Sequence, residues 1–147
     1  MTDINYSPNL PSAGENVSFR ATIKNISKGT SLEGIAIKVE FSIDGVSMIL
    51  WSDNYTHSIA PGQSVTLTVN MGDSGVVWNA IEGTLTVKAV VNAGNTIFES
   101  NTQNNSYGER MVVTKPCDLI VTNRYLAPLI WLIESEQKEK IACRRSK

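Results

Sequence analysis

The chain has 147 residues, a length that suits one domain with a short appendage. Hydrophobic residues make up 41% and charged residues 18%, which is ordinary for a soluble globular protein and sufficient for a core. The 13 basic and 14 acidic residues give a formal net charge of -1, so no overall positive field favours nucleic acid or anionic lipid.

Apolar and polar residues alternate along four stretches of the chain, at residues 17–24, 35–43, 64–71 and 84–91. A period of two is typical of half-buried antiparallel strands, because successive side chains point to opposite faces of a sheet. Two shorter strands are expected at residues 46–51 and 107–113. No helical period competes with this pattern before residue 115.

Turn-forming residues separate the expected strands. Asp44-Gly45 is a two-residue hairpin signal between residues 35–43 and 46–51. Pro61-Gly62 marks another turn, and loops are expected at residues 25–29, 72–75 and 93–95. About seven short strands at this spacing predict an all-β protein that folds as a two-sheet antiparallel sandwich.

The pattern changes after Lys115. Residues 118–122 predict a new strand, and Thr122 to Pro128 loosely repeats Thr2 to Pro8: a Thr, an aromatic residue, then a Pro at the same separation. We therefore expect a sandwich domain at residues 1–115, and a linker with the start of a truncated second repeat at residues 116–128. Residues 129–147 are expected to be a short amphipathic helix or a disordered tail.

The sequence contains only two cysteines, Cys117 and Cys143, and both lie outside the strand-patterned region. The disulfide that usually joins the two sheets of an immunoglobulin domain is therefore absent, and these two can pair only if the tail folds back. The start of the chain has no signal-peptide pattern, so an export signal would lie upstream. The longest apolar stretch, residues 129–133, is too short to span a bilayer.

Four stretches together resemble the CARDB family, the cell-adhesion-related domain found in bacteria and archaea. They are residues 3–17 (DINYSPNLPSAGENV), 21–25 (ATIKN), 51–62 (WSDNYTHSIAPG) and 95–105 (NTIFESNTQNN). The resemblance covers about residues 2–115. It implies an immunoglobulin-like sandwich of seven strands, in tandem arrays on exported proteins or beside catalytic domains of secreted polysaccharide-degrading enzymes. It implies no shared catalytic residues.

His57 is the only histidine, so a nucleophile–histidine–acid arrangement would have to use it, with Asp53 or Glu99 as its orienting acid. No strand-turn-helix pattern surrounds a serine in the way a nucleophile elbow requires. We therefore expect no catalytic residues and no enzyme activity, with His57 at the surface.

Carboxylate and amide side chains gather before the last strand, at Glu99, Asn101, Asn104 and Asn105. Calcium prefers such oxygen ligands, so these four are the predicted calcium-binding residues, and no other cofactor is suggested. No calcium-loop motif is present, however. The alternative is that these side chains bond to the loop backbone and hold the connection before the last strand.

Three aromatic residues, Trp51, Tyr55 and Trp78, are the predicted carbohydrate-binding residues, because aromatic faces suit the apolar faces of sugar rings. Trp51 and Tyr55 share the strand parity of Ile49, which favours burial of Trp51. Packing in the core or at a sheet edge is therefore the alternative, and Trp78 is expected to close one end of the core.

The leading hypothesis is a non-catalytic adhesion or spacer module of a secreted or cell-surface multidomain protein. The alternative is a carbohydrate-binding accessory module of a secreted polysaccharide-degrading enzyme. The expected partners are neighbouring domains of the same polypeptide, and a polysaccharide or cell-surface protein, but neither nucleic acid nor a membrane.

Overall fold

The computed structural model describes residues 1–72 and 76–119. Within these ranges it contains no helix. The strands are β1 (Asp3–Ser7), β2 (Asn16–Lys24), β3 (Val39–Ile43), β4 (Val46–Ser52), β5 (Ser64–Gly72), β6 (Trp78–Asn79), β7 (Gly83–Val91) and β8 (Ser106–Val113). Every pairing between these strands is antiparallel. The predicted all-β sandwich is confirmed.

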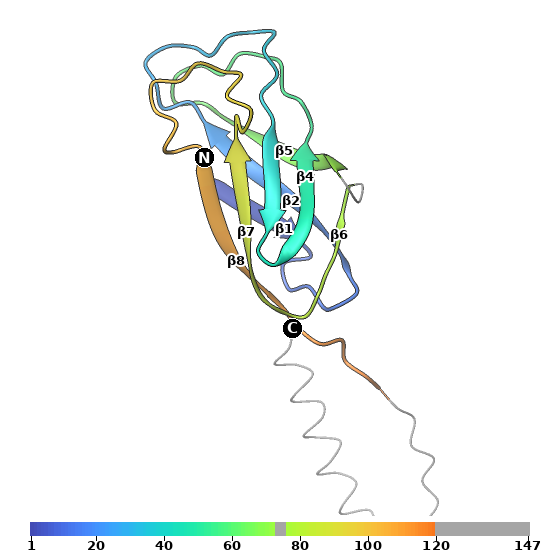
Figure 1. The fold of residues 1–147 in the computed structure, drawn as a ribbon. Helices are drawn as coiled ribbons and strands as arrows, with labels where there is room; N and C mark the ends of the chain where they lie inside the picture. Colours follow the sequence, from blue (N-terminus) through green and yellow to red (C-terminus); the bar gives the residue numbers. More distant parts are fainter. Residues whose placement is uncertain (73–75, 120–147) are drawn as a thin grey trace, which may run out of the picture.

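The strands follow one hydrogen-bonded path, β1-β2-β5-β4-β3-β7-β8, and the short β6 pairs with the start of β2. The path folds into two layers because β5 belongs to both (Figure 1). Its residues 64–68 pair with β2, and its later residues pair with β4. The predicted hairpin at Asp44-Gly45 joins β3 to β4.

The core lies between the two layers and is centred on three aromatic rings. Phe19 of β2 stacks on Phe41 of β3, with 6.1 Å between ring centroids. Phe19 also contacts Trp78, and the centroids of these two rings are 6.4 Å apart. All three rings are buried, and full burial of a large apolar side chain contributes about 1.5–3 kcal/mol. The alternation predicted for residues 17–24 is confirmed, because the inward row is buried: Val17, Phe19, Ala21 and Ile23.

Residues 35–38 differ from the sequence prediction, since the strand begins only at Val39. Gly34 has a φ of +83°, which favours glycine, and its N–H donates to the carbonyl of Thr56. Ile37 then forms an isolated antiparallel bridge with Tyr55. This segment pairs with the connection after β4 and not with a neighbouring strand. The chain joins the sheet only at Val39, where β3 begins.

The chain enters the sandwich at one end and leaves it at the other (Figure 1). The amine of Met1 donates to the carbonyl of Asn104, just before β8 begins. Thr114, just after β8, bonds to Pro11 and Ala13, which follow β1. We call these the entry end and the exit end. The eight residues of β8 separate them by about 26 Å at ~3.3 Å per residue.

Most of the predicted strand at residues 118–122, the predicted tail at residues 129–147, and Cys143 lie outside the described residues. The described residues contain no helix of the length and apolar character that a membrane crossing requires.

Candidate functional site

A pocket of about 660 Å³ opens at the entry end, between the β2–β3 connection and the β7–β8 connection. Its floor is apolar and consists of buried side chains from four separate segments: Ile23, Ile37, Ile59 and Val91. Pockets of this size and character are the usual form of small binding sites in proteins. The entry end is therefore the candidate functional site.

Three large apolar side chains stand exposed at the mouth of the pocket. Ile26 and Leu32 come from the β2–β3 connection, with 71% and 68% of their surface exposed, and Phe98 comes from the β7–β8 connection, fully exposed at 101%. Exposed apolar residues that lie singly are ordinary, but a cluster of them around an apolar pocket is typical of an interaction site.

The first wall of the pocket is held by Asn25 and Ser31 of the β2–β3 connection. The amide nitrogen of Asn25 donates to the carbonyls of Gly29 and Ile59, at 2.8 and 2.7 Å. The hydroxyl oxygen of Ser31 accepts a bond from the N–H of Ile59 at 2.7 Å. These bonds join the wall to the β4–β5 connection, and a loop fixed at both positions is preorganised for binding.

The second wall is held by Asn92, Glu99 and Asn105 of the β7–β8 connection. Asn92 is buried with a φ of +53°, a conformation that asparagine tolerates better than most residues. Glu99 Oε1 accepts bonds from the amide nitrogens of Asn92 and Asn105, at 2.6 and 2.9 Å. Asn92 also bonds in both directions with the backbone of Ile97. The carboxylate therefore ties the two ends of this wall together.

The N-terminal amine lies at the edge of the same pocket. Burial among the pocket residues lowers the pKa of the Met1 amine below its ordinary value of 8.0, while the Glu99 carboxylate acts in the opposite direction. The amine is thus partly desolvated where the chain meets the pocket.

The predicted calcium residues all lie in the second wall, and the structure gives them bonds within the protein. Asn101 Oδ1 accepts a bond from the N–H of Gln103, and the carbonyl of Asn104 accepts the Met1 amine. Glu99 Oε1 already accepts two amide donors, so an ion at this oxygen would compete with Asn92 and Asn105. The side-chain bonds of Glu99, Asn101 and Asn105 favour the structural role that the sequence offers as the alternative, and calcium binding stays a prediction.

The three predicted sugar-binding aromatics do not form one platform. Trp78 is only 2% exposed and packs against Phe19, so burial removes it from any sugar-binding face, while its predicted place in the core is confirmed. Tyr55 is partly buried, and its ring meets His57 edge-on at 5.6 Å.

Trp51 faces outward, and the parity argument that favoured its burial is wrong. Val46 pairs with Ile43 across the hairpin, and the same side of β4 continues inward to Leu50 and Ser52, at 1% and 0% exposure. Trp51 is therefore on the outer face of the sheet, half-buried. The ammonium of Lys38 lies over its ring, 4.1 Å from the centroid.

His57 is exposed, as the sequence predicts. The two carboxylates that could have oriented it have other partners. Asp53 Oδ1 accepts the N–H of Thr68, which fastens the end of β4 to β5. Glu99 accepts the amides of the second wall. The structure therefore gives His57 a ring contact with Tyr55 in place of a catalytic acid.

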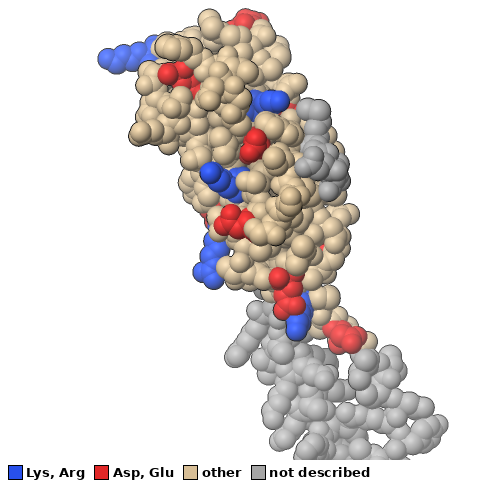
Figure 2. Space-filling model, viewed as in Figure 1, with Lys and Arg blue, Asp and Glu red and all other residues tan. Residues whose placement is uncertain are grey.

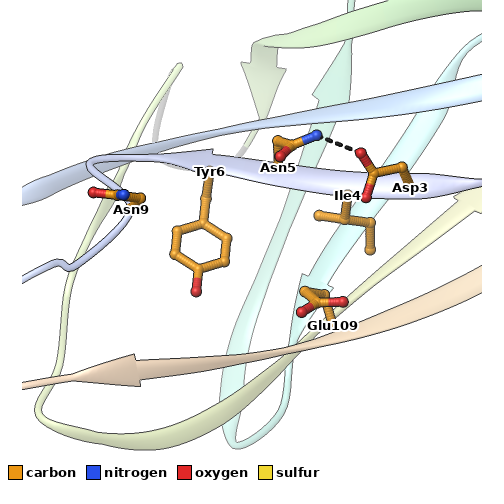
Figure 3. Close-up of a pocket in the computed structure, with 6 residues that line it drawn as sticks. All are labelled: Asp3, Ile4, Asn5, Tyr6, Asn9 and Glu109. Atoms are coloured by element: carbon orange, nitrogen blue, oxygen red, sulfur yellow. Dashed lines mark hydrogen bonds between the residues drawn. The ribbon is translucent and has the colours of Figure 1, made fainter.

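A smaller pocket of about 280 Å³ lies along the seam between β1 and β8 (Figure 3). Ile4, Tyr6 and Glu109 project into the seam, and Asn5 donates to Asp3 at 2.6 Å. The two strands lie beside each other here, but the hydrogen-bonded path ends at each of them. The seam is an open edge of the sandwich, narrowed by these side chains.

Charged side chains form no patch of one sign on the face shown in Figure 2. Figure 2 shows both signs scattered over it, with large uncharged areas between them, including around the entry end at the top of the view. The apolar mouth of the entry-end pocket brings together three of the exposed large apolar side chains of the described residues.

No direct signal of this pocket is present in the sequence, because each floor residue belongs to an ordinary strand or loop. The one usable signal is indirect. Two of the four stretches that resemble CARDB end in the residues that hold the walls, Asn25 and Glu99 to Asn105.

Two antiparallel layers, with β1 starting at one pole and β8 ending at the other, are the architecture of an immunoglobulin-like module. The CARDB family model matches residues 2–109, and the chain belongs to the CARDB family. The family is a non-catalytic, cell-adhesion-related one. A search of curated proteins finds no matching relative.

Two solved structures of the CARDB domain of the PF1109 protein from Pyrococcus furiosus resemble this chain. The crystal structure, in complex with di-metal ions, is 22% identical, with a TM-score of 0.50 over 76% of this chain and 88% of that one. The solution structure has the same identity and TM-score, over 76% of this chain and 92% of that one. The likeness establishes the shared fold.

Proposed function

We propose that the chain is a non-catalytic adhesion or spacer module of a secreted or cell-surface multidomain protein. One observation carries the proposal: the chain enters the sandwich beside Asn104 and leaves it at Thr114, about 26 Å away at ~3.3 Å per residue of β8. A module with this geometry lengthens a polypeptide when it is inserted into it. Its first partners are therefore the neighbouring domains of the same polypeptide.

The proposed module comprises residues 1–115, since β8 ends at Val113 and Thr114 is still bonded to the residues after β1. Residues 116–128 are proposed as a linker with the start of a truncated second repeat, followed by a tail at residues 129–147. The partial repetition of Thr2 to Pro8 at Thr122 to Pro128 supports this division.

The proposal is tested by mechanical unfolding of single chains. A spacer in a surface protein bears tension between its two ends. A pull on Met1 and Lys115 loads β1 and β8 along their lengths, so all the hydrogen bonds to β2 and β7 are sheared together. We expect a high unfolding force in this geometry.

The control pulls the same chain from positions 82 and 115, whose side chains lie 3.9 Å apart at the exit end. That geometry peels β7 from β8 one residue pair at a time, and we expect a clearly lower force. Equal forces in the two geometries would show that the fold is not arranged to bear load between its ends, and would count against a spacer.

A carbohydrate-binding accessory module is the second candidate, because Trp51 lies on the outer face of β4 next to Ile49, which is 40% exposed. Lys38 covers one face of the indole, so a sugar ring would have to displace it or use the edge. A glycan array with and without calcium tests this candidate, and loss of binding in Trp51→Ala with the fold intact would support it.

A metal is not part of the leading proposal. The PF1109 domain was solved with di-metal ions, but the described residues of this chain contain no group of three or more His, Cys, Asp or Glu side chains placed to hold one. Calcium at Glu99, Asn101, Asn104 and Asn105 stays a separate prediction with its own test below.

A further inference from the structure

The entry-end pocket and the exit end of the sandwich lie at the two ends of any linker between tandem copies. Thr122 stands in the partial second repeat where Thr2 stands in the first, so position 121 corresponds to Met1. Residues 115–120 therefore connect Thr114, which follows β8 and bonds to Pro11 and Ala13, to the first residue of the next copy. Seven Cα-to-Cα steps span at most about 25 Å.

This short connection starts at the exit end of one copy and arrives at the edge of the pocket of the next. Met1 and Thr2 both line the pocket, and Met1 is bonded to Asn104 in the second wall. A preceding copy is thus attached at the pocket's own edge, within about 25 Å of it.

The exit end carries the apolar side chains that such a contact needs. Ile81, in the turn before β7, is 57% exposed, and Leu119, on the departing chain, is 84% exposed. Glu82, which follows Ile81 in the chain, pairs with Lys115 at 3.9 Å. Interfaces between proteins usually combine buried apolar side chains with polar ones at the rim, and the exit end offers residues of both kinds.

We propose that the entry-end pocket is the docking site for the exit end of a preceding copy of the same sandwich. Ile81 and Leu119 of one copy cover the apolar mouth formed by Ile26, Leu32 and Phe98 of the next. This inference rests on the proposed role as a spacer in a tandem array, and it adds that the junctions of the array are rigid. Docking requires no rearrangement of the walls, because both are already fixed by hydrogen bonds.

The chain's three phenylalanines make the junction directly observable. Phe19 and Phe41 are buried, whereas Phe98 is fully exposed. In a chain labelled with fluorophenylalanine, a soluble gadolinium chelate broadens the fluorine signal of Phe98 and spares the other two. The sample is a head-to-tail dimer in which position 121 of one copy is followed by Thr2 of a complete second chain.

We expect one Phe98 signal of the dimer to broaden as in the single chain and the other to be protected severalfold. Phe98→Leu in each copy separately assigns the two signals, and the protected one belongs to the second copy. Ile81→Ser or Leu119→Ser in the first copy should expose it again. The same substitutions in the second copy are the matched control and should change nothing, because no copy follows it.

Equal broadening of both Phe98 signals would overturn the docking inference, as would protection that persists in both first-copy variants. Unchanged Phe19 and Phe41 signals show in each sample that both sandwiches are folded. A dimer that is folded but undocked would leave the spacer proposal standing, since the pulling experiment tests that proposal on the single chain. Protection of both signals would indicate association between dimers, and would equally overturn the inference.

Discussion

The hydroxyl of Ser52, the last residue of β4, joins β4 to the start of β3. It is fully buried, accepts the N–H of Val39 at 2.9 Å and donates to the carbonyl of Asp53 at 2.8 Å. Ser52→Ala leaves the Val39 N–H buried without this acceptor, so we expect a loss of about 1–3 kcal/mol in the free energy of unfolding. Urea denaturation measures it.

Ser47→Ala is the matched control, since Ser47 lies on the exposed side of the same strand. A similar loss in both variants would mean that the cost arises from the strand and not from the buried bond to Val39.

Glu99 gives a second test at a single residue, and it separates a structural role from calcium binding. Glu99→Ala removes the acceptor shared by Asn92 and Asn105, and we expect it to lower stability by about 1–3 kcal/mol. Glu99→Gln keeps a side-chain oxygen at this place, and we expect a smaller loss. Thermal unfolding with EDTA and with excess calcium completes the measurement.

A structural carboxylate predicts the same melting temperature of the native chain in EDTA and in calcium. A calcium ligand predicts a rise in melting temperature with calcium that Glu99→Gln abolishes, because an ion that binds only the folded state stabilises it. The second result would contradict the hydrogen-bonding role and restore the predicted ion site.

Among the elements, strands whose alternation is strict along their whole length could be predicted. The start of a strand, and the face of a strand with apolar residues on both sides, could not. The prediction is accurate for β2, where Val17 to Ile23 decide the inward face by themselves. It fails for residues 35–38, which alternate equally well, because their partner is Tyr55 and not the next strand. The prediction also fails for β4, because the apolar Ile49 suggested that its side of the strand faces the core, whereas Leu50 and Ser52 are the buried residues.

The pocket could not be predicted for a related reason. Its floor and mouth come from the ends of β2 and β7 and from the β2–β3, β4–β5 and β7–β8 connections, and no local pattern reports which of these segments meet. Local signals did reach the walls. Asn25 and Glu99 stood out as polar residues in loops, and each proves to be the centre of a hydrogen-bonded turn.

The outer face of β4 gives a prediction about an element. Trp51→Ala removes the contact with Lys38, and an exposed cation–π pair contributes about 0.5–1 kcal/mol. We therefore expect the sandwich to remain folded with only a small loss of stability, by circular dichroism and thermal unfolding. A loss of several kcal/mol would show that the indole is part of the core, contrary to its place on the outer face.

At the scale of the whole molecule, the question is whether residues 1–115 contain everything that the sandwich needs to fold. Thr114, just after β8, still bonds to the sandwich backbone at Pro11 and Ala13. Met111 and Val113, at 0% and 2% exposure, still belong to the core. A chain that ends at Lys115 therefore keeps every strand and every core side chain of the described structure.

We expect a chain that ends at Lys115 to show the same β-type circular dichroism and nearly the same melting temperature as the full chain. A chain that ends at Arg110 should not fold, because it lacks Met111 and Val113. Removing a buried Met side chain alone costs about 2–5 kcal/mol, against about 5–15 kcal/mol for a whole domain. Any helical signal present only in the full chain reports the segment beyond Lys115. If the chain that ends at Lys115 unfolds, residues after it contribute to the sandwich and the module extends further than β8 and Thr114 indicate.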